Sequence, residues 1–171
     1  MEVSELPVPE PGPGEVRIRV AAATVNPTDI GFRTGRQLNA AQLAEMGVKP
    51  PYVPGMELAG VVDAVGAGAP WRVGDRVMAI VNPRRPGGGA QAEQVVVPSA
   101  SVARVPEGTS LERVRVSAYF ENQAALEQLA RLVAGGRLTL RVARTFPPEE
   151  AASAQETLAA GGTRGRLLIA F

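Results

Sequence analysis

Carboxylates are the only side chains in this sequence that suit conventional acid–base chemistry. The 171 residues include no histidine and no cysteine. A Ser-His-Asp triad, an imidazole base, a thiolate nucleophile and a thiolate metal site are therefore excluded. Two carboxylates are candidates: Asp29 follows a predicted core strand, and Glu57 precedes an apolar run. Either is a buried catalytic carboxyl with a raised pKa, or it forms an ion pair with an arginine or caps a turn.

A glycine-rich segment, Gly87–Ala92, formally matches the G-x-G-x-x-A dinucleotide-binding pattern. That chemistry needs a strand before the glycines and a helix N-terminus after them, so that backbone donors reach a pyrophosphate. A β-rich apolar run follows this segment instead. We therefore expect a structural loop, and no phosphate-binding loop is visible elsewhere in the sequence.

The aromatic residues favour packing over catalysis. Tyr52 and Tyr119 are the only tyrosines, and each is expected to pack with its hydroxyl hydrogen-bonded. Trp71 precedes a Gly-Asp turn and is predicted to anchor a core.

The composition excludes further classes of protein. With 18 Lys and Arg against 17 Asp and Glu, the net charge of +1 argues against a nucleic-acid partner. The 45% of hydrophobic residues indicates a globular chain. The apolar runs are too short to span a bilayer, and the acidic N-terminus has no apolar signal region, so we expect a cytoplasmic protein with no membrane partner.

The first part of the chain is predicted to form short strands joined by Gly/Pro turns, which is typical of a barrel or sandwich. The predicted strands are 15–23, 60–65, 76–81, 94–97 and 102–105, with a short helix over 39–46 and a turn over 26–29. The later part mixes types: strands over 114–120, 138–142 and 166–171 alternate with helices that begin near Asn122 and Pro147 and end at glycine pairs.

Six segments in this order resemble the GroES-like catalytic domain of medium-chain dehydrogenases/reductases. They are Pro7–Gly14, Asn26–Asp29, Pro54–Val62, Val73–Val77, Gly88–Glu93 and Val105–Gly108. The Asn-Pro-x-Asp motif points to the zinc-independent quinone oxidoreductase branch. Phe146–Ala152 and Gly161–Leu167 resemble the C-terminal segment of the same family, so the resemblance covers nearly the whole chain.

The resemblance implies an α+β, mainly β fold: a GroES-like β-barrel of short strands with two C-terminal helices and no Rossmann domain. Residues 1–111 are expected to form the barrel, and 112–171 to complete the same domain. In the family a nucleotide-binding domain separates these parts, whereas here Ser110–Glu112 runs almost directly into 114–116. Asn26 and Met56 stand where alcohol dehydrogenases carry zinc ligands. We therefore expect no metal and no nicotinamide cofactor.

The resemblance also places a site in the former cleft between domains. Asp29, Asn26 and Glu57 are the expected catalytic or supporting residues, and the expected apolar walls of the substrate pocket are Phe32, Tyr52, Met56 and Tyr119.

Three functions remain open. One is a cofactor-independent enzyme that performs a cyclisation, cycloaddition, isomerisation or dehydration on an apolar biosynthetic intermediate such as a polyketide. The others are a non-catalytic small-molecule-binding or interaction protein, and an inactive remnant of an oxidoreductase from which the nucleotide domain was deleted. The orphaned strand Val114–Tyr119 further predicts a homodimer, since an open strand edge invites pairing.

Overall fold

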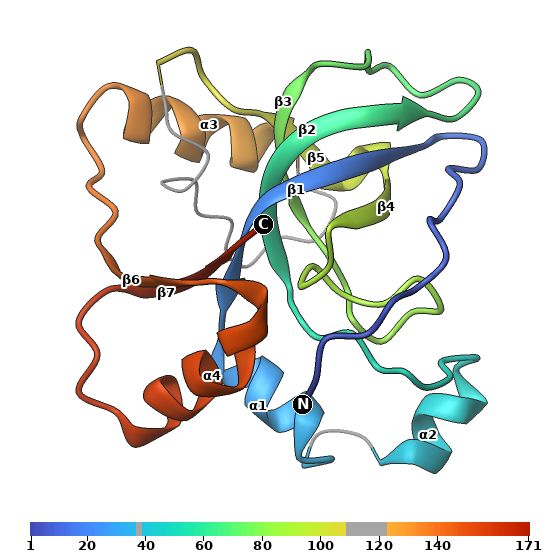
Figure 1. Ribbon diagram of the computed structural model, residues 1–171. Helices are drawn as coiled ribbons and strands as arrows, with labels where there is room; N and C mark the ends of the chain where they lie inside the picture. The colour runs from blue at the N-terminus through green and yellow to red at the C-terminus, as the bar shows by residue number, and fades with distance from the viewer. Residues whose placement is uncertain (37–38, 109–122) are drawn as a thin grey trace.

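In the described residues, seven strands form one sheet and four α-helices lie outside it. The computed structural model describes residues 1–36, 39–108 and 123–171. The strands are β1 (Glu15–Val25), β2 (Glu57–Val65), β3 (Arg76–Ile80), β4 (Gln94–Pro98), β5 (Val102–Arg104), β6 (Val142–Phe146) and β7 (Arg166–Ala170). The helices are α1 (Pro27–Arg33), α2 (Ala40–Glu45), α3 (Gln123–Ala134) and α4 (Ala151–Ala160), with 3-10 turns η1 (Ser99–Ser101) and η3 (Pro148–Glu150). The sheet order is β5-β3-β2-β1-β7-β6, and β4 also pairs with β1 (Figure 1).

Strand β1 organises this sheet because it is long enough to have three neighbours. One edge pairs antiparallel with β2. The other edge pairs first with β4 and then, over Ala22–Val25, with β7. The C-terminal strand therefore lies directly beside the end of β1, just before Asn26.

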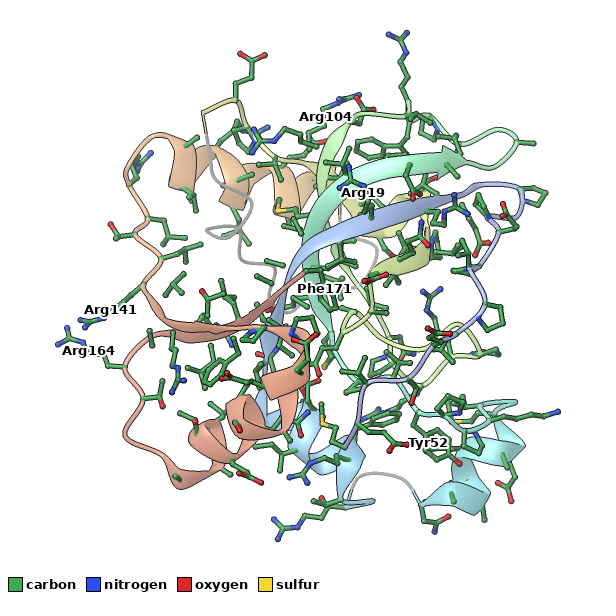
Figure 2. The ribbon with its side chains drawn as sticks, in the orientation of Figure 1. Arg19, Tyr52, Arg104, Arg141, Arg164 and Phe171 are labelled. Atoms are coloured by element: carbon green, nitrogen blue, oxygen red, sulfur yellow. The ribbon has the colours of Figure 1, made fainter. Side chains whose placement is uncertain are left out.

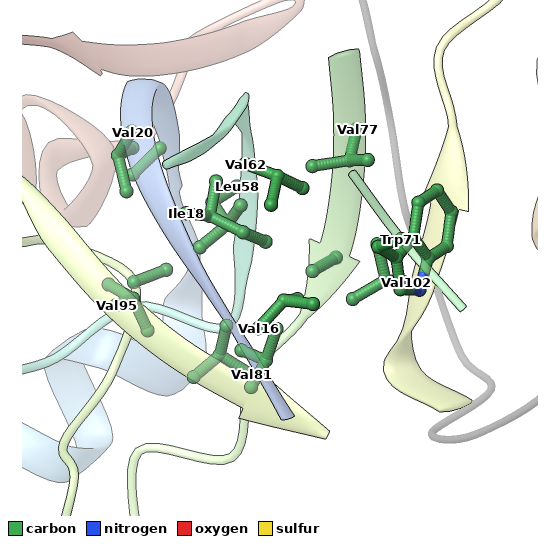
Figure 3. Packing of buried hydrophobic residues seen from close by; sticks show 14 residues of the cluster. Val16, Ile18, Val20, Leu58, Val62, Trp71, Val77, Val81, Val95 and Val102 are labelled. Carbon is green, nitrogen blue, oxygen red and sulfur yellow. The ribbon is translucent and has the colours of Figure 1, made fainter. Parts of the chain in front are cut away.

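The main core lies between β1, β2, β3, β4 and β5. Alternation along β1 buries Val16, Ile18 and Val20, which are 0%, 0% and 3% exposed. They pack in one cluster with valines of the other four strands and with Trp71 (Figure 3). The predicted barrel strands and the predicted role of Trp71 as a core anchor are confirmed.

The C-terminal part adds a β–α–β unit to the same sheet. β6 and β7 pair in parallel, and α4 connects them. Phe146 and Ala154 pack with Val25 of β1 in a second cluster. Gly161 ends α4 with a positive φ of 77°, as the glycine pair predicts.

Two sequence predictions are wrong in detail. The segment 26–29 was expected to be a turn, but Pro27 begins α1 because proline suits the first position of a helix. The strand predicted over 138–142 instead begins at Val142. Pairing with β7 buries Phe146, whereas Leu138 stays 38% exposed. The register with β7 therefore determines where β6 begins and ends.

The observed architecture confirms an α+β, mainly β fold. The predicted strand and dimer edge Val114–Tyr119, and with them the pocket residue Tyr119, lie outside the described residues. Within the described ranges, no helix is both long and apolar enough to cross a lipid bilayer.

Candidate functional site

The site is built where β1 passes into α1. Asp29, the third residue of α1, accepts a hydrogen bond from the backbone N–H of Asn26 at 2.8 Å. This bond satisfies a donor that the start of a helix would otherwise leave unpaired. Asp29 is only 1% exposed. The carboxylate therefore caps a helix and is also one of the few charged groups buried in the fold.

Asp29 also joins two other segments to α1. Its Oδ1 accepts from the backbone N–H of Gly55 at 3.0 Å, and its Oδ2 accepts from Nε2 of Gln91 at 3.3 Å. Burial raises the pKa of Asp29 to about 6, against the hydrogen bonds from Asn26 and Gly55 that lower it, and the charge of Glu57 raises it further. Asp29 thus holds three segments together, and keeping its negative charge in the interior costs free energy.

A chain of side-chain hydrogen bonds connects Glu57 to Arg166 through two neutral residues. Arg166 Nη1 donates to Asn26 Oδ1 at 2.5 Å. Asn26 Nδ2 donates to Thr24 Oγ1 at 2.8 Å, and Thr24 Oγ1 donates to Glu57 Oε2 at 2.9 Å. Every donor points towards Glu57, so the chain runs in one direction from a cation to an anion. This order fixes the orientation of the Asn26 amide.

The register of the sheet explains this chain. Ala23 pairs with Leu58, so the next position along places Thr24 opposite Glu57. Val25 pairs with Leu167, which likewise brings Arg166 beside Asn26. Side chains directly across an antiparallel pair lie on the same face and interact. Two cross-strand pairs therefore make one polar network.

The glycine-rich loop before β4 serves this site as structure. Backbone hydrogen bonds from Gly89, Ala90 and Gln91 reach the carbonyls of Val53, Gly55 and Pro54, respectively, each at 2.9 Å. A Cβ on Gly89 would lie 2.4 Å from the Pro54 carbonyl oxygen, so only glycine permits the approach. The loop leads into a strand and holds the Gln91 side chain against Asp29. The expectation of a structural loop is confirmed.

The predicted wall residues lie in two places. The Phe32 and Tyr52 rings meet edge to face with centroids 6.2 Å apart. Phe32 is buried in a small cluster with Leu43 and Val48, whereas Tyr52 is 36% exposed. Met56 is half-buried and lies between Gly55 and Glu57, the first residue of β2.

Sequence reasoning missed Thr24, Gln91 and Arg166. Thr24 was visible as a polar residue within a buried strand, and Gln91 as a polar residue after the glycines. No sequence signal linked Arg166 to Asn26, because that contact depends on which strands pair.

Among the residues that the structure describes, none are arranged to hold zinc or a nicotinamide cofactor. The described part of the chain holds no group of three or more His, Cys, Asp or Glu side chains placed to bind a metal ion. Asn26 is committed to Thr24 and Arg166. In the described ranges, the one glycine loop of dinucleotide type leads into β4 and packs against 53–55, so it presents no helix N-terminus to a pyrophosphate.

Comparison with known proteins agrees with this architecture. The synaptic vesicle membrane protein VAT-1 homolog-like of Mus musculus is 35% identical over 111 residues, which are 64% of this chain and 24% of that protein. The chain thus spans about a quarter of this curated relative. A quinone oxidoreductase from Coxiella burnetii matches with a TM-score of 0.82 at 17% identity, covering 97% of this chain and 93% of that chain. An NAD-dependent alcohol dehydrogenase matches with a TM-score of 0.84 at 19% identity, covering 99% and 95%.

At these identities the structures show a shared fold. The family model of the alcohol dehydrogenase GroES-like domain matches residues 12–107, which is more than half of the chain and includes Asn26, Asp29, Glu57 and Gln91. The chain therefore belongs to the alcohol dehydrogenase GroES-like domain family, and its described residues contain no Rossmann nucleotide-binding domain.

Proposed function

We propose that this chain catalyses a non-redox step, namely a cyclisation, cycloaddition, isomerisation or dehydration, on an apolar molecule that carries a carbonyl group. The observation that carries the proposal is the fixed amide of Asn26. Its oxygen is taken by Arg166, and one of its two N–H groups is taken by Thr24. A primary amide has a second N–H donor, for which the described residues provide no partner. In this proposal, that second donor binds the substrate carbonyl.

A donor held in place can polarise a carbonyl without reorganising during the reaction. Where the carbonyl activates the reacting carbon atoms, electron density shifts onto its oxygen in the transition state, and a fixed N–H there is worth roughly 3 kcal/mol of stabilisation. The bonds formed and broken belong to the substrate, with water as the only leaving group in a dehydration. No oxidant or reductant is consumed. This chemistry suits a chain whose described residues hold neither a zinc site nor a nicotinamide site.

The other predicted site residues support Asn26. Asp29 fixes the backbone N–H of Asn26, and Glu57 is the acceptor at the end of the chain that orients its amide. Both are positioning residues in this proposal. Met56 and Tyr52 keep the role of apolar pocket residues in this proposal, where they would exclude water and favour a compact substrate conformation.

The test is turnover without any nicotinamide. The protein is incubated with a panel of apolar β-polycarbonyl thioesters and linear enones, and mass spectrometry follows products of unchanged mass or of mass lower by one water. Asn26→Ala is expected to lower turnover about a hundredfold or more. Asn82→Ala is the matched control, since Asn82 is exposed and accepts a local hydrogen bond from the backbone N–H of Arg84.

The outcomes separate the candidate functions. Turnover that Asn26→Ala leaves unchanged would move the chemistry to another site. Saturable binding without turnover would make the chain a small-molecule-binding protein. If the protein shows no binding and no turnover with any compound of the panel, that result would favour an inactive remnant. A parallel titration with NADPH is expected to show no saturable binding at micromolar concentrations, and such binding would contradict the non-redox assignment.

A further inference from the structure

Arg166 is a half-buried arginine for which the part of the chain that the structure describes provides no carboxylate partner. Two arginine pairs show the usual arrangement, Arg17 with Asp63 and Arg104 with Asp75, whereas the half-buried Arg85 donates to the backbone carbonyl of Val96. Arg166 donates from Nη1 to the neutral amide oxygen of Asn26, and the described residues provide no ion pair for it. Charged side chains that leave water are normally paired. Within the described residues no carboxylate fills this role, so an anionic group of a ligand would complete the pairing.

Most N–H donors of the Arg166 guanidinium have no recorded partner among the described residues. An arginine carries five N–H donors in a planar fork, and only one hydrogen bond from Arg166 is recorded in the described part of the chain. A planar fork with free donors matches a carboxylate, which accepts two parallel N–H bonds.

The guanidinium is also held in place before a ligand arrives. The Asn26 oxygen must face Arg166, because the amide nitrogen donates to Thr24 and Thr24 donates to Glu57. Glu57 is separated from Arg166 by the side chains of Thr24 and Asn26. Its negative charge therefore favours a cation at the Arg166 end of the hydrogen-bonded series, but it does not occupy the donors of the guanidinium. Pre-organisation of this kind reduces the entropy lost on binding.

We infer that the substrate carries a carboxylate which binds Arg166 beside the carbonyl that Asn26 polarises, which makes it an oxo acid with an apolar tail. This inference rests on the proposed function for the role of Asn26. Arg166 and Asn26 are in direct hydrogen-bond contact, so one small molecule reaches both when its carboxylate and its carbonyl are close neighbours.

The charge at this point favours a carboxylate over a phosphate. Arg164, the nearest arginine along the chain, is exposed, and its side chain points away from the body of the molecule together with Arg141 (Figure 2). A single guanidinium matches a singly charged carboxylate, whereas a doubly charged phosphate calls for more than one cation.

Calorimetry with four probes tests the inference on the full chain. The probes are 2-oxooctanoate, octan-2-one, which lacks the carboxylate, octanoate, which lacks the oxo group, and inorganic phosphate. We expect 2-oxooctanoate to bind at least about tenfold more tightly than octan-2-one, as a charge-assisted hydrogen bond to carboxylate provides. Phosphate is expected not to bind, and saturable phosphate binding at Arg166 would replace the carboxylate by another oxyanion and overturn the assignment.

Variants connect the effect to the residue. Arg166→Gln should remove the preference for the acid over the ketone, and Arg166→Lys should keep part of it. Arg164→Gln is the matched control and should change nothing. Equal affinity of wild type for acid and ketone, an unchanged preference in Arg166→Gln, or an equal loss in Arg164→Gln would each overturn the inference. If Arg166→Gln does not fold, the comparison of probes on wild type still decides.

This experiment also separates the inference from the function on which it rests. Binding of the oxo acid that depends on Arg166, without any turnover, would support the anion site and contradict the proposed catalysis. Turnover that is indifferent to Arg166 would support the catalysis and contradict the anion site.

Discussion

Arg166 donates a hydrogen bond from Nη1 to the side-chain oxygen of Asn26 at 2.5 Å, across 140 positions of the chain. The contact exists because β7 pairs with the end of β1, so the last strand delivers its first residue to the start of α1. It fastens the C-terminal unit to the polar network and fixes the Asn26 amide. The function proposed for the site therefore depends on correct pairing of the C-terminal strand.

A double-mutant cycle on this pair should reveal the coupling. Asn26→Ala and Arg166→Gln each remove the bond, so the two together should cost less than the sum of the single variants. We expect a coupling of roughly 1–2 kcal/mol in the free energy of unfolding, because one partner is charged and the other is buried. Urea unfolding measures it. Arg164→Gln combined with Asn26→Ala provides the control cycle, which should be additive.

Alanine substitutions at the two ends of the glycine triplet should have different effects on stability. Gly89→Ala places a Cβ 2.4 Å from the Pro54 carbonyl oxygen, within a backbone that cannot yield, and should destabilise the protein by roughly 2 kcal/mol or more. At Gly87 the nearest atoms belong to the flexible Arg85 side chain at 3.5 Å. Gly87→Ala should therefore be tolerated within about 0.5 kcal/mol.

Thermal and urea unfolding of both glycine variants decide the role of the loop. Equal and small effects at the two positions would mean that the backbone approach seen here does not constrain the loop, and a ligand-binding role for the glycines would return.

Gln155 is a buried amide whose replacement by an apolar residue should stabilise the protein. It is 0% exposed on α4, and neither its Oε1 nor its Nε2 has a hydrogen-bond partner in the described structure. An unpaired buried polar group costs about 1–3 kcal/mol. Gln155→Met keeps the length of the side chain without the polar atoms, and we expect it to raise the free energy of unfolding by about 1 kcal/mol or more.

The exposed Gln128 of α3 is the control, because Gln128→Met should change stability little. Destabilisation by Gln155→Met would instead show that a bound water or ligand group satisfies the amide, and would make Gln155 part of a second polar site.

Much of this fold was predictable from the sequence, because its signals are local. Alternation gave the strand of Val16 and Ile18 its buried face, and glycines marked the ends of α3 and α4. The strand around 138–146 was misplaced because its register depends on β7, a partner that no local pattern identifies.

The candidate site divides in the same way. Asp29 and Glu57 were found from their apolar sequence surroundings, and both are buried, at 1% and 9% exposure. Arg166 was missed because strand register, not spacing along the chain, brings it to Asn26. The interpretation of Asp29 as either catalytic or capping is resolved in part: it caps α1, and its role in catalysis stays a prediction.

Asp29 should make the stability of the protein fall as the pH rises from 5 to 8. Its pKa in the folded state is raised to about 6 from an ordinary value of 3.8, chiefly because burial disfavours the charged form. A carboxyl whose pKa is raised on folding binds its proton more tightly in the native state than in the unfolded chain. The stability that it contributes is therefore full below pH 3.8 and is lost as the pH rises through about 6.

Linkage between these two pKa values gives a loss of about 1.4 kcal/mol between pH 5 and pH 8. Urea unfolding at the two pH values measures it, and Asp29→Asn supplies the comparison. The variant should be less stable overall, because an amide cannot accept all three of the hydrogen bonds from Asn26, Gly55 and Gln91. Its stability should nevertheless lose this slope, since an amide does not titrate. A slope that survives in Asp29→Asn, or a wild-type protein that grows more stable over this range, would show that the carboxylate keeps an ordinary pKa and that its three donors outweigh its burial.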